Sequence, residues 1–513
     1  MRARITVLQP ADGLVYKWTR NRTKRLAVGM AYVATAAAKK GHDINIVDAS
    51  LEDLTVEETV NRALENDPHL VGITCTTPLY HLAMEISHLI KSRNPSTAVV
   101  FGGPHPASLP IPTLKTSGAD FVAKGEGEIS FPAIIDCVLN NKNPDNIPSI
   151  VYKWNGFTGE TDSYLRYVKE KKINSESDLI KPLDLNDVAY PDRRLFKYNE
   201  YIDYARDIEG PQTMAMFSRG CPGKCAFCGA ADTLVRFRNL DNIFEELNDI
   251  NNLGITNLAV NDDTYTSNKK RVLKLSRGIV EREFNLNISV QLRLDQVDRE
   301  ICDAMWDSGV RYVGPGIESG NDSIISQIGK GPKESRKNMK GKIRLLQEYD
   351  WKIRNSYVFG MPGETEEQIL ETIEFAKELG ADENAFSILV PYPDSPLWSF
   401  AKAKGQVDDY MDFSKFLYYH EIGCNLSAVS TERLLELHEF AYEYVGNPAY
   451  RLDDDAVSSG NRPHIPYLMS EKFKKHRKKA KLELDDYTYD DYTKRFDELE
   501  NKKYGMKYKR ENM

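Results

Sequence analysis

The stretch Phe217-Ser-Arg-Gly-Cys221-Pro-Gly-Lys-Cys225-Ala-Phe-Cys228 places three cysteines in a C-x3-C-x2-C arrangement, directly after a β-like run. Three thiolates this close together, with glycines and a proline between them, can surround one soft metal centre. Iron–sulfur clusters are normally held by four cysteines, and this loop supplies three, so one iron would stay open to a small-molecule ligand. The alternative is three structural cysteines, but nothing in the hydrophobic pattern requires them at this spacing.

The composition describes a chain that can form two or three domains, each with its own core. It has 513 residues, of which 41% are hydrophobic, enough to bury a large interior. The net charge of −8 argues against nucleic acid as the main partner. The other four cysteines are scattered, which is not a disulfide framework and favours a reducing compartment.

Membrane association is not indicated by the hydropathy pattern. No apolar run approaches the roughly 20 residues that cross a bilayer. The first residues enter a strand pattern without the apolar core of a signal peptide, so we expect a cytoplasmic protein with no transmembrane segment.

The N-terminal part of the chain, residues 1–140, alternates short β-branched runs with helix-length segments. Strands are expected at 5–8, 43–47, 70–74, 98–101 and 121–123, with helices such as 29–40 and 82–92 between them. This alternation predicts an open parallel sheet of the Rossmann-like α/β class. In such sheets ligands bind beyond the carboxyl ends of the strands.

Glycines, hydroxyls and carboxylates follow three of these strands. The candidate cofactor-binding residues are Thr74, Thr76 and Thr77 after the third strand, Gly102, Gly103 and His105 after the fourth, and Gly125, Glu126, Gly127 and Glu128 after the fifth. Glycines let a backbone approach a bulky ligand, and exposed hydroxyls and amides can bind its polar rim. In this order the segments resemble a cobalamin-binding domain. The alternative is a generic nucleotide-binding or degenerate sheet.

The resemblance also concerns how cobalamin would be held. Cobalamin proteins that bind cobalt through histidine carry Asp-x-His-x-x-Gly. The same spacing occurs here at Asp67-Pro-His69-Leu-Val-Gly72, but it leads into the strand expected at 70–74, so its histidine would lie at the amino end of the sheet, away from the carboxyl ends where ligands bind. The resemblance therefore implies base-off cobalamin with no histidine on cobalt.

The rest of the chain divides into three regions by pattern. Residues 141–210 read as a linker rich in turns, with one small hairpin near 150–157. Residues 211–398 contain six strand candidates, at 213–218, 257–261, 287–292, 312–317, 353–359 and 384–389, which predicts a partial (βα)6 barrel with its active site at the strand ends. Residues 399–513 read as mostly helical, with an amphipathic segment at 430–444 and a basic run at 473–479 before an acidic, tyrosine-rich one at 483–492.

The cysteine motif, with an aromatic residue just before its last cysteine, resembles the radical S-adenosylmethionine (SAM) superfamily. That resemblance implies a [4Fe-4S] cluster on Cys221, Cys225 and Cys228, whose open iron binds the methionyl part of SAM. Further SAM contacts would come from strand ends in the barrel, and the candidates are Asp263, Gln291, Arg293, Glu318 and Ser319, with Asp262 facing either SAM or substrate. The alternative is that several of these residues cap the helices that follow.

Together the two resemblances imply a cobalamin-dependent radical SAM enzyme, similar to class B methyltransferases. Such an enzyme would methylate an unactivated carbon through a 5′-deoxyadenosyl radical and methylcobalamin. A cyclase or rearrangement enzyme with the same cofactors is the alternative, followed by a non-catalytic cobalamin or redox sensor. A methylthiotransferase would need further N-terminal cysteines for a second cluster. We expect an external electron donor, and a substrate that is a protein side chain, a lipid or a natural-product intermediate.

Overall fold

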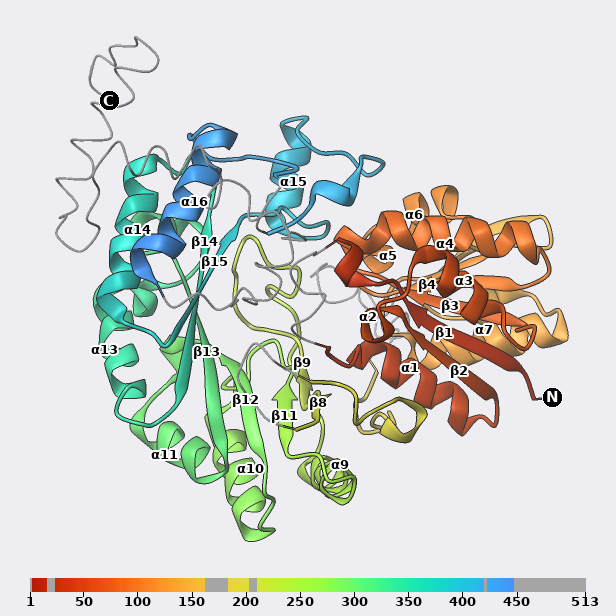
Figure 1. Ribbon diagram of the computed structural model, residues 1–513, viewed down its shortest axis with the longest axis horizontal. Helices are drawn as coiled ribbons and strands as arrows, with labels where there is room; N and C mark the ends of the chain where they lie inside the picture. Colours follow the sequence, from red (N-terminus) through yellow and green to blue (C-terminus); the bar gives the residue numbers. More distant parts are fainter. Residues whose placement is uncertain (1, 16–23, 162–182, 203–209, 419–421, 447–513) are drawn as a thin grey trace, which may run out of the picture.

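Figure 1 shows a computed structural model of the protein, which describes residues 2–15, 24–161, 183–202, 210–418 and 422–446. Two α/β domains lie side by side, each built on its own sheet. The charged runs at 473–479 and 483–492 lie outside the described residues.

The N-terminal sheet has seven strands in the order β2-β1-β3-β4-β5-β6-β7. Their bounds are β1 (Arg4–Gln9), β2 (Asp43–Asp48), β3 (Leu70–Thr74), β4 (Ala98–Gly102), β5 (Phe121–Ala123), β6 (Ile150–Trp154) and β7 (Phe157–Glu160). The first five strands are parallel, and β6 and β7 add antiparallel. The hairpin expected in the linker therefore extends this sheet.

Strands β1, β3, β4 and β5 are largely apolar, as expected where helices cover both faces of a parallel sheet. The helices are α1 (Val28–Lys39), α2 (Ala49–Glu52), α3 (Val56–Leu64), α4 (Tyr80–Arg93), α5 (Pro104–Ser108), α6 (Pro110–Thr116) and α7 (Gly127–Asn140). Helices α1 and α7 pack on one face, and α3 and α4 on the other. The strand order changes direction between β1 and β3, which is where a ligand crevice forms in doubly wound sheets.

The second sheet confirms the six expected βα units. Its parallel strands follow the order β15-β14-β13-β12-β11-β8. They are β8 (Gln212–Ala215), β11 (Asn257–Val260), β12 (Asn287–Leu292), β13 (Val310–Glu318), β14 (Lys352–Phe359) and β15 (Glu383–Ile388). Within the described residues the edge strands β8 and β15 do not pair with each other, so the barrel is partial and open.

Helices lie along the outer side of this curved sheet (Figure 1). They are α9 (Leu240–Asn252), α10 (Lys269–Glu281), α11 (Arg299–Asp307), α12 (Asp322–Gln327), α13 (Arg336–Leu346) and α14 (Glu366–Leu379). Helix α14 starts at a capping box in which Thr365 and Gln368 satisfy each other's backbone N–H groups, and it ends at Gly380 in the left-handed conformation. The apolar faces of these helices and the strands form the largest hydrophobic core within the described ranges.

A buried ion-pair network fixes the linker to the second domain. Arg193 donates to Glu246 of α9 over 2.7 Å, and Arg238 also pairs with Glu246. The side chains of all three are 3% exposed or less. Breaking such a buried pair is costly, so the linker is held firmly here.

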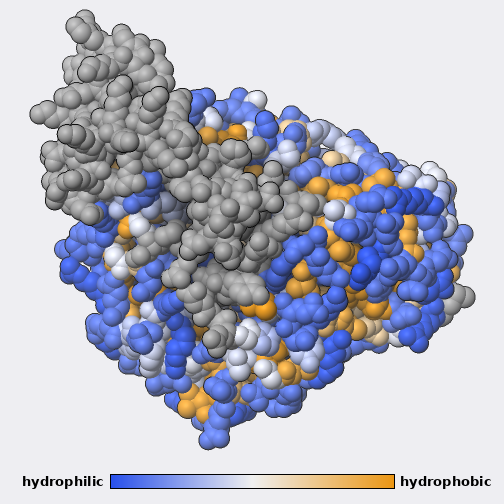
Figure 2. Space-filling model, viewed as in Figure 1, coloured by the Kyte–Doolittle hydropathy of each residue, from blue (hydrophilic) through white to orange (hydrophobic). Residues whose placement is uncertain are grey.

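Beyond the sheet, the described chain forms α15 (Pro396–Ala403), turns with one short 3-10 helix, and α16 (Thr431–Val445). Helix α16 packs against α14 and β15. In Figure 2 hydrophilic residues cover most of the visible described surface, with hydrophobic residues in smaller groups between them. In the described ranges, none of the helices combines the length and the apolar character that crossing a membrane requires.

Candidate active site

The three cysteines of the motif lie on the loop between two short antiparallel strands, β9 (Ser218–Arg219) and β10 (Arg236–Phe237). All three are free and partly buried. Figure 1 shows β9 beside the second sheet, on the side that faces the N-terminal domain. The cysteine loop thus lies where the two domains meet.

Two acids at the end of β11 fix the start of this loop. Asp262 accepts hydrogen bonds from the backbone N–H groups of Phe217 (2.7 Å) and Ser218 (3.0 Å) and from the Ser218 hydroxyl (2.6 Å). Asp263 accepts from the N–H of Gly220 over 2.8 Å. Burial raises the pKa of Asp262 to about 6. Asp262 is therefore occupied with the backbone, and contact of Asp263 with a cofactor stays a prediction.

The surroundings of the sulfurs suit a cluster held by thiolates, whose negative charge Lys330 and Arg293 can offset. Burial raises the pKa of all three thiols, that of Cys225 to about 11, while Lys330 and Arg293 act in the opposite direction on Cys225. The Arg293 guanidinium lies 3.7 Å from the Cys225 sulfur. Thiols in such a place stay neutral until a metal ion displaces the proton.

The donor set fits a cluster better than a single ion. No three His, Cys, Asp or Glu side chains in the described ranges are grouped as the ligands of one metal ion would be. A cuboidal cluster does not require that, because each cysteine binds a different iron. Three soft sulfur donors on one loop match an iron–sulfur cluster.

Charged side chains from the ends of β12 and β13 and from the turn after α12 meet beside the cysteine loop. Lys330 lies 3.4 Å from Glu318 and 3.3 Å from Glu334, and Arg293 donates to Glu334 (2.5 Å) and Asp295 (3.1 Å). Although burial opposes its charge, the pKa of Lys330 is raised by Glu318 and Glu334. Neither Lys330 nor Glu334 is among the SAM contacts predicted from the sequence, because the turn that follows α12, and not a strand end, brings them to the site.

Glycines in β13 make room for two of the predicted residues. A Cβ at Gly314 would lie 2.4 Å from the Gln291 side chain, and one at Gly316 would lie 2.3 Å from Glu318. Glu318 itself has φ of +67°, at an irregularity in the β13–β14 register. Strained backbone of this kind gathers at functional sites. The structure therefore brings Arg293 and Glu318 to the cysteine loop, whereas Gln291 lies over Gly314 and its contact with SAM stays a prediction.

Ser319 is placed differently. It is fully buried, and its hydroxyl lies 3.0 Å from the Thr372 hydroxyl and accepts from the N–H of Asn321. It shapes the turn into α12, so its predicted contact with SAM has no support in this arrangement.

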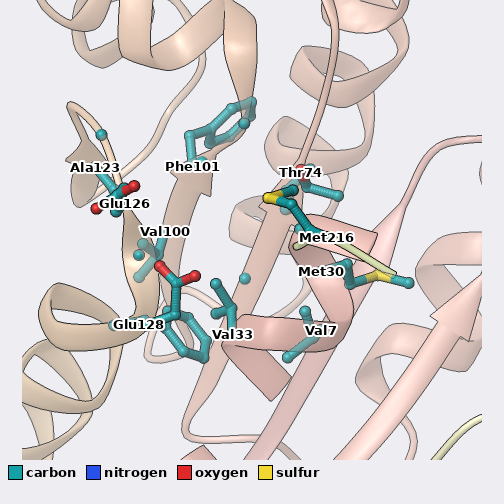
Figure 3. A pocket seen from close by; sticks show the side chains of 18 of the residues that line it. Val7, Met30, Val33, Thr74, Val100, Phe101, Ala123, Glu126, Glu128 and Met216 are labelled. Atoms are coloured by element: carbon teal, nitrogen blue, oxygen red, sulfur yellow. The ribbon is translucent and has the colours of Figure 1, made fainter. Parts of the chain in front are cut away.

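A cavity of about 190 Å³ opens at the carboxyl ends of β1, β3, β4 and β5 (Figure 3). Its lining includes Val7, Gly29, Met30, Val33, Gly72, Ile73, Thr74, Val100, Phe101, Gly102, Gly103, Ala123, Gly125, Glu126, Gly127, Glu128, Phe131, Met216 and Arg219. Seven of the ten residues predicted to bind a cofactor in this domain therefore lie around one space. Met216 and Arg219 come from the second domain, so the cavity has walls from both.

Glycines keep this cavity open. Gly103 has φ of +96°, and a Cβ there would lie 2.7 Å from the Thr74 hydroxyl. Around Gly102, by contrast, a Cβ would meet nothing within 4 Å. The free space above Gly102 is what a bulky, mostly apolar ligand would fill.

Three predicted residues lie outside the cavity lining. His105 is 1% exposed, stacks on Tyr80 with ring centroids 4.1 Å apart, and lies within hydrogen-bonding distance of Thr77. Burial lowers the pKa of His105 to about 3, so it stays neutral. Thr76 is exposed on the same loop. His105 thus packs inside the domain.

Glu126 and Glu128 line the cavity and also pair with arginines beside the cysteine loop. Figure 3 shows both on one side of the cavity, across from Thr74 and Met216. Both also form ion pairs with Arg219 or Arg236, which flank the cysteine loop. Sequence reasoning found the two carboxylates but not their arginine partners.

Comparison with known protein families gives two matches. Residues 26–135 match the B12 binding domain, and residues 216–376 match the radical SAM superfamily. These ranges contain the cysteine loop and every residue given for the cavity lining except Val7.

Among named relatives, an uncharacterized methyltransferase of Pyrococcus horikoshii is 30% identical over 384 residues, covering 73% of this chain and 78% of the relative. The anaerobic magnesium-protoporphyrin IX monomethyl ester cyclase of Synechocystis sp. is 23% identical over 406 residues, covering 77% and 76%. Among solved structures, the radical S-adenosylmethionine methyltransferase TsrM from Kitasatospora setae, with cobalamin and a [4Fe-4S] cluster bound, superposes with a TM-score of 0.62. It is 18% identical and each chain is covered to 79%, which supports the fold.

Proposed function

This chain belongs to the cobalamin-dependent radical SAM enzymes, and on that basis we propose that it is a C-methyltransferase acting on an unactivated carbon. The observation that carries the proposal is the shared wall between the two sites. Met216 and Arg219 line the cavity of the N-terminal domain and lie five and two residues before Cys221. A methyl carrier in the cavity and a radical generator on the loop would therefore act on one substrate.

The residues present would hold each group by its chemistry. Cys221, Cys225 and Cys228 would bind three irons and leave the fourth to SAM. When bound, the cluster supplies the electron that cleaves SAM, and cobalamin supplies a carrier for the methyl group. The protein's own contribution is to place the reacting groups in contact and to exclude water.

The charged residues beside the cysteines suit the two ends of an amino acid. Glu318 carries the negative charge that an ammonium group needs, and Lys330 and Arg293 carry the positive charge that a carboxylate needs. Gln291 crosses over Gly314 in the same part of the barrel. We assign these four residues to SAM.

We further propose that cobalamin binds base-off, with no histidine on cobalt. The cavity lies between the strand ends and the side chain of Phe131 in α7, and its lining is largely apolar. A planar aromatic base detached from cobalt fits such a place. The histidine of the neighbouring loop, His105, is held by Tyr80 and Thr77 instead.

The second candidate function is a cyclase with the same cofactors. It is favoured by the 23% identity to the magnesium-protoporphyrin ester cyclase. Both reactions need the same cofactor sites, so the product alone distinguishes them. In either case an external donor would supply the electron for the cluster.

The first test is cofactor content. Anaerobically purified protein supplied with hydroxocobalamin should contain one cobalamin and about four irons per chain. Cys225→Ala should lose iron and SAM cleavage yet still bind cobalamin. Gly102→Val should fill the cavity and lose cobalamin while keeping iron, because Gly102 has ordinary φ and open space around it. Gly341→Val, at a remote position in α13 that is equally open, is the matched control.

The second test is the fate of the methyl group. SAM labelled in its methyl group is supplied to the holoenzyme with extract from its own cells, and the label is traced into protein, lipid and small-molecule fractions. These fractions correspond to the three substrate classes that we propose. If none of the fractions contains label and a new product without the added methyl group forms, the reaction is cyclisation and not methylation.

A further inference from the structure

Two arginines stand directly opposite each other at the base of the cysteine loop. In the antiparallel pair β9–β10, Arg219 is the register partner of Arg236. Their side chains are 16% and 17% exposed. Like charges directly opposite on neighbouring strands destabilise the pair, so this hairpin needs anions beside it.

The anions come from the other domain. One Glu126 oxygen accepts from Arg219 (2.9 Å) and from Arg236 (2.6 Å), and Glu128 accepts from Arg219 (2.5 Å). Within the described residues, the ion pairs of both arginines go to these two carboxylates. Burial opposes the charge of Glu126, but its hydrogen bond to Arg236 and the charge of Arg219 hold its pKa below the usual range. We call these four residues the interdomain charge cluster.

The interdomain charge cluster belongs to both sites at once. Glu126, Glu128 and Arg219 line the cavity. Arg219 is also separated from Cys221 only by Gly220, which has φ of +97° and lies so close to the Leu234 carbonyl that a Cβ would be 2.2 Å from it. Because Gly220 has no free space, a displacement of Arg219 would be transmitted along the backbone to Cys221.

We propose that the interdomain charge cluster positions the cysteine loop according to the occupancy of the cavity, so that cobalamin and the iron–sulfur cluster strengthen each other's binding. A ligand in the cavity holds residues 125–128, at the start of α7, in place, and their carboxylates hold the β9–β10 hairpin closed below the cysteines. The inference rests on the proposed cofactors for the identity of the two ligands. Coupling of this kind is reciprocal, so either affinity reports it.

The experiment is a hydroxocobalamin titration of the full chain, followed by its absorption spectrum, once with the cluster present and once after iron removal. In the wild type we expect the dissociation constant to be at least about 5-fold lower with the cluster present. In Glu126→Gln the ratio should fall toward one. If Glu126 merely supported the fold, its replacement would raise both dissociation constants by the same factor and leave their ratio unchanged.

Two further variants keep the test decisive. Glu128→Gln removes one of the ion pairs and should give an intermediate ratio, which serves if Glu126→Gln folds poorly. Glu160→Gln breaks an ion pair with Lys124 inside the N-terminal domain and should keep the wild-type ratio. A wild-type ratio of one, or the full ratio in both Glu126→Gln and Glu128→Gln, would overturn the coupling. Failure of the wild-type chain to bind cobalamin at all would overturn the proposed function as well.

Discussion

Replacing Asp262 by alanine should loosen the entry to the cysteine loop. The change removes the acceptor of two backbone N–H groups, those of Phe217 and Ser218, which are 1% and 2% exposed. An unsatisfied buried donor costs about 1–3 kcal/mol, so the loss is about 2–6 kcal/mol. At about 2–4 °C per kcal/mol for a domain of this size, the Tm of the second domain should fall by about 4 °C or more.

The assay combines thermal unfolding of the iron-free chain with iron content after anaerobic reconstitution. Asp262→Ala should lower both, while Asp262→Asn should keep both, because its amide oxygen still accepts from the two N–H groups and its NH₂ can donate to the Ser218 hydroxyl. An unchanged Tm in the alanine variant would refute this reasoning. Equal iron loss in the asparagine variant would mean that the negative charge itself, and not the hydrogen bonds, is required.

Two more outcomes follow from the geometry. Gly329→Val should lower iron retention, because Gly329 has φ of +81° and a Cβ there would lie 2.3 Å from the carbonyl of Lys224, the residue before Cys225. The measurement is iron content after reconstitution, compared with that of Gly331→Val, whose glycine has open space and an ordinary φ. Burial lowers the pKa of His438 to about 4, so the unfolded chain takes up its proton first, near pH 6.5, and stability is lost as pH falls below that value. At pH 5 the free energy of unfolding is lower by about 2 kcal/mol for this reason. Denaturant unfolding at pH 7 and at pH 5 should therefore show a smaller difference in unfolding free energy for His438→Gln than for the wild type. An equal difference in the two proteins would contradict the assignment to His438.

The strands could be predicted from the sequence wherever burial on both faces made an apolar run. The bounds of β3, β5 and β12 agree with the expected ones. Strand β13 was expected to end at residue 317, and it runs to Glu318 through a backbone irregularity that no local pattern encodes. The pairing of β6 with β5 is likewise a long-range contact, so its sequence indicated a hairpin but not the sheet it joins.

In the candidate site, too, some features could be predicted from the sequence and others could not. Cysteine spacing and glycine-rich strand ends mark the two cofactor regions, because chemistry demands those residue types in that order. Side-chain partners are decided by the packing of distant segments. The burial of His105 against Tyr80 and of Ser319 against Thr372 could not be foreseen for that reason. The pairing of Glu334 with Arg293 across 41 residues is of the same kind.

The hairpin with two facing arginines also bears on how the chain is made. Glu126 precedes Arg219 by 93 residues and Arg236 by 110. Domains generally fold as units during synthesis, with the N-terminal one first. We therefore expect the carboxylates to be in place, on a folded surface, when the ribosome releases the two arginines, so that the hairpin closes against the first domain. A chain expressed without its first domain would have to close that hairpin against its own charge.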